Sequence, residues 1–262
     1  MTELMPNARM PRSVLVASDA LYLQLASDPD TIGLLQRVDA MVVPYAANPL
    51  FNESRVLRVR EHLDLRSQLT EGSILIKNPF DLDSFEIAEN AIAAFTADKY
   101  RVMAKLAALL GAVEVTLGEA RVESERAEWS GDLKSRFKIG SGASSAKREV
   151  RGQVTSRISA HLTFPGGSPS LEQAREHLDR HNLSRDNELN ALVQLREGPY
   201  PVIRFEMKMS GTKELESSLR CALDLANAGP VKLLQIGGSF TKTANVIKDI
   251  EITTTIDFPT PE

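Results

Sequence analysis

Cysteine is almost absent from the sequence, since Cys221 is the only one among 262 residues. A single thiol cannot form an intrachain disulfide, and a zinc site built from several cysteines is excluded for the same reason. The N-terminal residues contain no apolar signal-peptide core, and nowhere do 18 apolar residues follow one another. We therefore expect neither a signal peptide nor a transmembrane helix. These features predict a cytoplasmic protein, with peripheral association at a membrane as the alternative.

Motifs of catalysis and nucleotide binding are also missing. The stretch GSGASSAK at residues 140–147 contains the residue types of a phosphate-binding loop. A P-loop requires GxxxxGK followed by Ser or Thr, whereas here Ala146 precedes Lys147 and Arg148 follows it. No G-x-S-x-G nucleophile motif occurs either. The sequence thus indicates no cofactor and favours a non-enzymatic protein.

The bulk composition is that of a folded globular protein. Hydrophobic residues make up 42% of the chain and charged residues 25%, with a formal net charge of −4. We expect a single α+β domain over residues 1–262. Its first 12 residues, which hold Pro6, Pro11 and few apolar anchors, are expected to form a loose tail.

Hydrophobic periodicity predicts a mostly antiparallel sheet with helices packed on one of its faces. The expected strands lie within residues 113–164, 201–209, 231–238 and 247–258. The expected helices cover residues 84–110, 170–196 and 213–228. In the first of these helices, apolar residues recur every three or four positions except at the step across Lys99.

The pentapeptide REHLD occurs twice, at residues 60–64 and 175–179. Both copies end the apolar stripe of a predicted helix, and similar elements follow each copy in the same order. A true repeat keeps a fixed period. The two pentapeptides are 115 positions apart, whereas the glycines that stop the following helices, Gly111 and Gly229, are 118 apart. This drift leaves only a weak indication of an internal pseudo-repeat.

Residues 131–164 form the most informative stretch of the sequence. A flexible tip, GSGASS, separates two flanks in which apolar and basic residues alternate, as in a half-buried antiparallel pair. The stretch contains seven Lys and Arg residues against Asp132 and Glu149, a net charge of +5. The sequence therefore predicts a long, basic, amphipathic β-hairpin.

A face that concentrates one sign of charge is typical of a protein that binds an anionic partner. Nucleic-acid phosphates and membrane-lipid headgroups both have the required charge. A solvated sheet face without a partner is the alternative, because Lys and Arg also protect strands from edge pairing. The expected contact residues are Lys134, Arg136, Lys138, Lys147, Arg151 and Arg157.

A second hypothesis is that the hairpin inserts into a membrane. The second flank is about 18 residues long, whereas a spanning β-strand needs about 10. A glycine-tipped hairpin followed by helices and another strand, over residues 130–210, resembles the pore-forming domain of gasdermins. That resemblance implies a pore-forming protein that assembles as a homo-oligomer.

A third hypothesis concerns His177 and His181. Their i, i+4 spacing places both side chains on one side of a helix, as in the metal-binding helices of zinc hydrolases. However, the Glu of an HExxH motif is missing from its place, and a catalytic zinc site needs a third protein ligand. We therefore expect no metal, and a metal-dependent hydrolase centred on these histidines is the remaining alternative.

Overall fold

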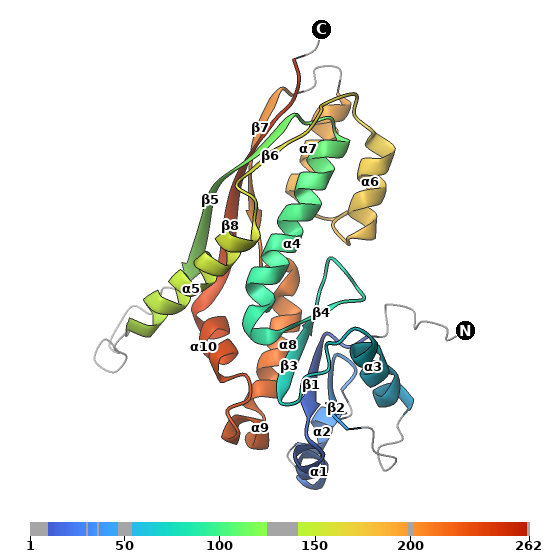
Figure 1. Cartoon of the computed structure of the whole chain (residues 1–262), viewed down its shortest axis with the longest axis vertical. Coiled ribbons are helices and arrows are strands. Elements are labelled where there is room, and N and C mark those ends of the chain that lie inside the picture. The colour runs from blue at the N-terminus through green and yellow to red at the C-terminus, as the bar shows by residue number, and fades with distance from the viewer. Residues whose placement is uncertain are drawn as a thin grey trace. The chain divides into compact units, whose positions relative to one another are not determined.

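The computed structural model describes residues 10–29, 31–35, 37–46, 54–124, 141–198 and 202–260. The fold is α+β, as predicted, but it contains two four-stranded, mostly antiparallel sheets instead of one (Figure 1). The chain forms two compact units, and each unit contains one of these sheets. Unit 1 comprises residues 1–91 and 215–245, and unit 2 comprises residues 92–214 and 246–262. That residues 1–262 behave as a single domain stays a prediction.

The sheet of unit 1 has the strand order β2-β1-β3-β4. Its strands β1 and β2 pair in parallel, and the other two pairs are antiparallel. The strands are β1 (Ser13–Ala17), β2 (Ala40–Pro44), β3 (Ser73–Lys77) and β4 (Phe85–Ile87). The helices are α1 (Asp19–Ser27), α2 (Ile32–Leu35), α3 (Ser54–Leu65), α8 (Glu216–Asn227), α9 (Gly229–Leu233) and α10 (Gly238–Val246).

Helices cover both faces of this sheet, so β1 and β2 are buried along their whole length. On one face, Val56, Val59 and Leu63 of α3 pack in a core cluster with residues of β1, β2 and β3. This is the stripe that ends in the first REHLD copy. On the other face, α8 packs against β1 and β3. The expectation that helix 213–228 covers the antiparallel sheet of the second half is therefore wrong.

The sheet of unit 2 is antiparallel throughout, with the order β6-β5-β8-β7. Because its strand order and directions differ from those of the first sheet, the structure does not confirm the pseudo-repeat. The strands are β5 (Glu114–Ser124), β6 (His161–Thr163), β7 (Arg204–Ser210) and β8 (Ile247–Asp257). The helices are α4 (Ala88–Leu109, which begins in unit 1), α5 (Ser141–Arg157), α6 (Leu171–Arg180), α7 (Asn187–Glu197) and the 3-10 helix η2 (Lys213–Leu215).

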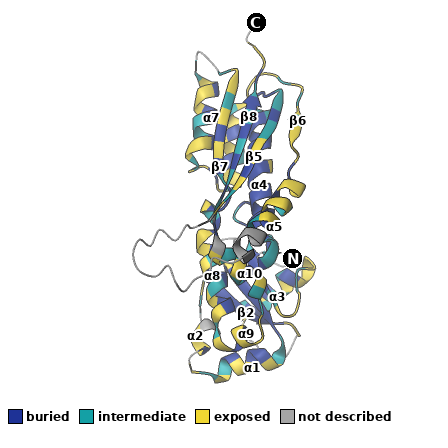
Figure 2. Cartoon of the chain, turned by 90° about the vertical axis from the view of Figure 1, so that its left-hand side faces the viewer, coloured by how far each residue is buried: buried dark blue, intermediate teal, exposed yellow. Residues whose placement is uncertain are grey.

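The strand β8 follows the predicted alternation. Ile250, Ile252 and Ile256 are fully buried, and the residues between them are buried less, except for Thr254. Figure 2 shows this change between buried and partly exposed residues along the strands of the sheet. The period of two places one face of the strand on the core of unit 2 and leaves the other partly exposed.

The predicted β-hairpin at residues 131–164 is wrong for its second flank. Residues Ser141–Arg157 form the helix α5, and only His161–Thr163 pair with β5 as a strand. The apolar residues Val150, Val154 and Ile158 are four positions apart, a spacing that fits both a strand and a helix. The first flank, residues 131–140, lies outside the described residues.

The strand predicted at residues 231–238 is also wrong. Residues Gly229–Leu233 form the short helix α9, and a turn follows it. Pro230 stands in the first helical turn, where the missing N–H of proline costs no hydrogen bond. A short apolar run such as VKLLQI has no periodicity that separates strand from helix.

Two glycines of unit 2 offer a matched test of the packing. A Cβ atom added to Gly211 would lie 2.6 Å from side-chain atoms of the buried Thr96, whereas one added to Gly152 meets nothing within 4 Å. We expect Gly211→Ala to lower the free energy of unfolding by about 1–3 kcal/mol through overpacking. Gly152→Ala should raise it by about 1 kcal/mol, because alanine favours a helix over glycine. Urea denaturation of both variants checks the two signs, and equal effects would contradict the close approach of the Gly211 turn to α4.

Candidate functional site

Half of the predicted contact residues lie on one helix. Lys147, Arg151 and Arg157 belong to α5, together with Arg148, which the sequence did not single out as a contact. Arg148, Arg151 and Arg157 are exposed and Lys147 is half-buried. The other predicted contacts, Lys134, Arg136 and Lys138, lie outside the described residues.

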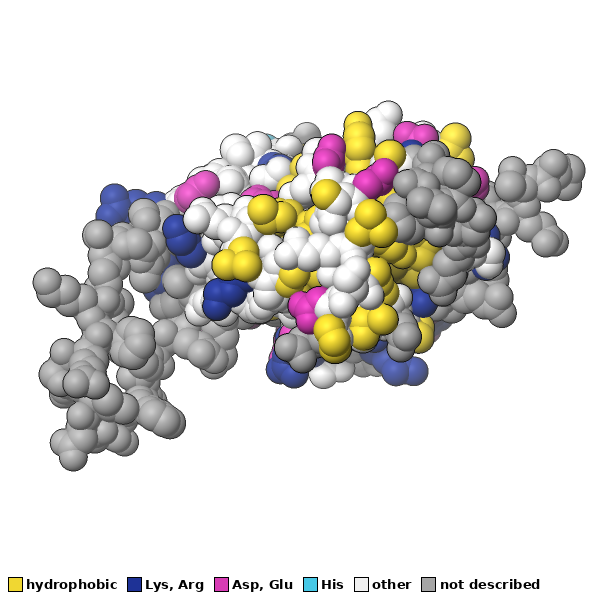
Figure 3. Space-filling view, turned by 90° about the horizontal axis from the view of Figure 1, so that it is seen from below, with side chains coloured by type: hydrophobic (Ala, Val, Ile, Leu, Met, Phe, Trp, Pro, Cys, Tyr) yellow, Lys and Arg dark blue, Asp and Glu magenta, His cyan; other side chains and the backbone are white. Residues whose placement is uncertain are grey.

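An apolar stripe anchors α5 to unit 2. Val150, Val154 and Ile158 are at most 7% exposed, and α5 packs against β5. The basic side chains are therefore presented by a helix whose apolar side is already buried. Within Ser141–Arg157 the sequence has four basic residues and one acidic residue, Glu149. Figure 3 shows Lys and Arg side chains on its left and also along its lower edge.

The exposed face of α4 adds one further cation beside this helix. The guanidinium of Arg101 donates to the carbonyl oxygen of Arg157 at 3.4 Å and also pairs with the carboxylate of Asp98. The sequence did not indicate this neighbour, because α4 and the end of α5 are far apart along the chain. We use the name α5 basic face for the basic side chains of this helix, namely Lys147, Arg148, Arg151 and Arg157. Arg148 and Arg157 are nine positions apart and therefore project from opposite sides of the helix. Arg101 lies at the end of this set and is partly neutralised by Asp98.

The two histidines of the proposed metal site do lie together. The rings of His177 and His181 meet edge to face with centroids 4.7 Å apart. The Nε2 atom of His177 is 3.0 Å from the carbonyl oxygen of Val102, and burial lowers the pKa of this ring. Among the residues that the structure describes, no three His, Cys, Asp or Glu side chains are grouped to hold a metal ion. The arrangement therefore gives no support to a metal-dependent hydrolase.

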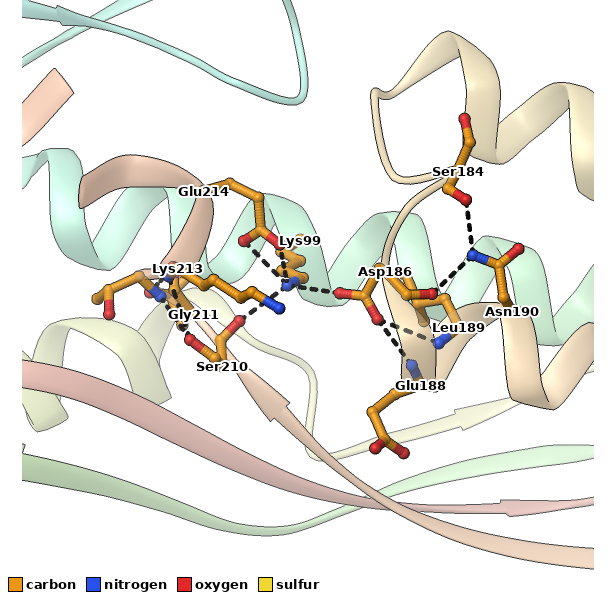
Figure 4. Close-up of polar contacts among 12 residues, drawn as sticks. Lys99, Ser184, Asp186, Glu188, Leu189, Asn190, Ser210, Gly211, Lys213 and Glu214 are labelled. Atoms are coloured by element: carbon orange, nitrogen blue, oxygen red, sulfur yellow. Dashed lines mark hydrogen bonds and ion pairs between the residues drawn. The ribbon is translucent and has the colours of Figure 1, made fainter. Parts of the chain in front are cut away.

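Unit 2 contains a buried ion cluster that no pattern in the sequence indicated. Lys99, on α4, is 1% exposed and its ammonium bridges two carboxylates. The Nζ atom lies 2.9 Å from Asp186 and 2.8 Å from Glu214, and donates to the carbonyl oxygen of Ser210 at 3.0 Å (Figure 4). Helix α4, the start of α7 and the turn after β7 are thereby joined at one atom.

Each carboxylate of the cluster is itself held. Asp186 is the N-cap of α7 and accepts hydrogen bonds from the amides of Glu188 and Leu189, both at 3.1 Å. Glu214 contacts the ammonium with both of its oxygens. Because these two carboxylates and the Ser210 carbonyl already engage the ammonium, the geometry is that of a structural ion cluster and not of a catalytic lysine.

The single cysteine lies in unit 1 next to another ion pair. The Sγ atom of Cys221 donates to Asp39 at 3.2 Å, and Asp39 pairs with Arg37 at 3.0 Å. Burial and the neighbouring carboxylate raise the pKa of the Cys221 thiol to about 11, whereas the hydrogen bond from Arg37 lowers the pKa of Asp39. A reactive thiol has a lowered pKa, so the surroundings of Cys221 are those of an unreactive thiol.

No helix among the described residues is long and apolar enough to cross a membrane. Comparison of the chain with models of protein families, with curated proteins and with solved structures finds no match. Any proposal for its function therefore has to be based on the residues themselves.

The ion cluster predicts that Lys99→Met destabilises the protein. We expect the free energy of unfolding to fall by about 3 kcal/mol, because the substitution leaves two partly buried carboxylates without their cation. Lys105→Met, at an exposed position of the same helix, should change it by less than about 0.5 kcal/mol.

A triple variant, Lys99→Met with Asp186→Asn and Glu214→Gln, should recover more than half of this decrease in stability. It removes the unpaired charges and keeps an N-cap residue on α7. Urea denaturation measures all three proteins. A single variant that is as stable as the triple variant would show that the charges contribute nothing.

The environment of Cys221 predicts slow alkylation. At pH 8 we expect the native thiol to react with iodoacetamide at least about tenfold more slowly than the same thiol in the urea-unfolded chain, because little thiolate is present. The Asp39→Asn substitution should speed the reaction, since it removes a negative charge that raises the thiol pKa. Mass spectrometry of timed samples gives the rates, and equal native and unfolded rates would rule out the raised pKa.

Proposed function

We propose that this chain binds the phosphate backbone of a nucleic acid through the α5 basic face. The observation that carries the proposal is the concentration of four basic side chains on one anchored helix of a protein whose formal net charge is −4. Local charge of one sign attracts an opposite partner even when the whole protein has the other sign. Arginine, which provides three of the four side chains, binds phosphate oxygens with two parallel hydrogen bonds.

The burial of the apolar stripe favours a nucleic acid over a membrane. A helix that lies on a membrane places its apolar face among the lipid chains. In α5 that face is formed by Val150 and Val154, which are buried, as is Ile158 directly after the helix. Membrane insertion would have to pull these residues out of the protein, whereas contact with phosphates uses side chains that already reach the solvent.

The pore-forming alternative depended on an amphipathic strand over the second flank of the predicted hairpin. That segment is helical as far as Arg157, so it lacks the strand that the comparison with gasdermins assumed. The structure therefore gives the pore hypothesis no support, and that hypothesis stays untested.

The expected mode of binding is non-specific. Contacts to phosphates fix the position of a protein on nucleic acid but do not read its sequence. Aromatic residues, which stack on single-stranded bases, make up only 5% of the chain and none lies on α5. We therefore expect similar affinities for oligonucleotides of unrelated sequence.

The test is a triple variant, Arg148→Gln, Arg151→Gln and Arg157→Gln. Fluorescence anisotropy with two unrelated duplexes of about 20 base pairs should show binding that weakens steeply from about 50 to about 200 mM salt. The variant should bind more weakly at every salt concentration. Its slope of log K against log salt should be smaller in magnitude by about 2 to 3, because each arginine that no longer binds a phosphate reduces the slope by about one.

A matched control keeps the same change in net charge. The substitutions Arg175→Gln, Arg180→Gln and Arg220→Gln remove three exposed guanidinium groups from α6 and α8. This control should retain the wild-type salt slope. If both triple variants weaken duplex binding equally, the effect comes from net charge and not from α5, which would contradict the proposal. Binding to phosphatidylserine vesicles without binding to the duplexes would favour a membrane partner instead.

A further inference from the structure

Unit 1 contains a pocket of about 520 Å³, a volume within the range of small-molecule sites. It lies between the end of α8, the helix α9, the turn that follows it and the first turns of α10. Its polar side chains come from all four segments, namely Asn227, Lys232, Gln235, Ser239, Thr241 and Lys242. The pocket is distinct from the α5 basic face, which belongs to unit 2.

The positive charge of the side chains that line the pocket favours an anionic ligand. Lys232 and Lys242 are both exposed at the pocket, and none of the described residues that line it is acidic. Because the neighbouring Asn, Gln and Ser side chains are uncharged donors and acceptors, they can orient a ligand without cancelling this charge.

The backbone at the start of α10 adds to the positive electrostatic potential of the pocket. Gly237 has a left-handed φ of 70°, and an added Cβ there would lie 2.9 Å from the side chain of Ile74. Two carbonyl oxygens of this turn accept hydrogen bonds from amides of α10. The amide of Gly238 donates to the carbonyl oxygen of Gln235, and the amide of Thr241 donates to that of Gly237. The amide of Ser239, which lines the pocket, lies in the same first turn, where an α-helix provides no acceptor.

We propose that this pocket binds a small molecule that carries a phosphate group. Lys232 and Lys242 contact the phosphate, and the amide of Ser239 donates to one of its oxygens. Two lysines match the two negative charges of a phosphate monoester, and the remaining volume holds the organic part of the ligand beside Asn227 and Gln235.

The experiment is a titration of the full-length, ¹⁵N-labelled protein with phenyl phosphate at constant ionic strength. We expect a saturable shift of the amide signal of Ser239. The variant Lys232→Ala, Lys242→Ala should weaken the apparent affinity by about tenfold or more, because each lysine contributes a charge-assisted contact. Lys105→Ala, at an exposed position of unit 2, should bind as the wild type does.

The proposal is overturned if the shifts do not saturate or if the lysine variant binds with unchanged affinity. Saturable shifts confined to α5 would likewise overturn it and would assign the phosphate response to the α5 basic face. A titration with benzyl alcohol in place of phenyl phosphate should give no saturable shift, and equal binding of the two compounds would show that the pocket recognises the ring and not the phosphate. Because neither variant in this test changes α5, the result is independent of nucleic-acid binding.

Discussion

The ammonium of Lys99 is the interaction on which the architecture of unit 2 depends. It is buried, and burial of a charge is tolerated only where partners replace the water. Its partners come from positions 186, 210 and 214, which are far from α4 in the sequence. The ammonium therefore has its partners only when α4, the start of α7 and the turn after β7 lie together. The cluster thus specifies this arrangement as well as stabilising it.

The same turn is held from its other side. The carboxylate of Asp249 accepts hydrogen bonds from the hydroxyl groups of Ser210 and Thr212, at 2.8 Å and 2.6 Å. Gly211 between them approaches Thr96 on α4, about one helical turn before Lys99. Hydrogen bonds and close packing thus both constrain this short segment. A larger residue at position 211 would collide with Thr96, close to the buried charge of Lys99.

Sequence periodicity predicted those elements whose apolar residues fit only one period. The alternation of Ile250, Ile252 and Ile256 gave β8, and the stripe that ends at Leu63 gave α3. Periodicity gave the wrong structure for α5, because Val150, Val154 and Ile158 are four positions apart and fit both periods. It also treated Lys99 as a gap in an apolar stripe, whereas Lys99 occupies a buried position in that stripe through partners that no local pattern reveals. Three of the six predicted contacts were found on one helix, but their neighbour Arg101 depends on tertiary structure.

The error in α5 matters for function because it changes what the basic residues can do. On a strand of an amphipathic hairpin, the apolar face can leave the protein together with the strand. On α5, the apolar side is buried in unit 2 and the arginines are exposed on a fixed helix. A helix that is already folded and anchored needs no further ordering of its backbone when it meets phosphates. Insertion into a membrane would have to pull Val150 and Val154 out of unit 2. The anchoring of α5 is therefore central to the proposed binding of phosphates, because it leaves the arginines exposed while the apolar side stays buried.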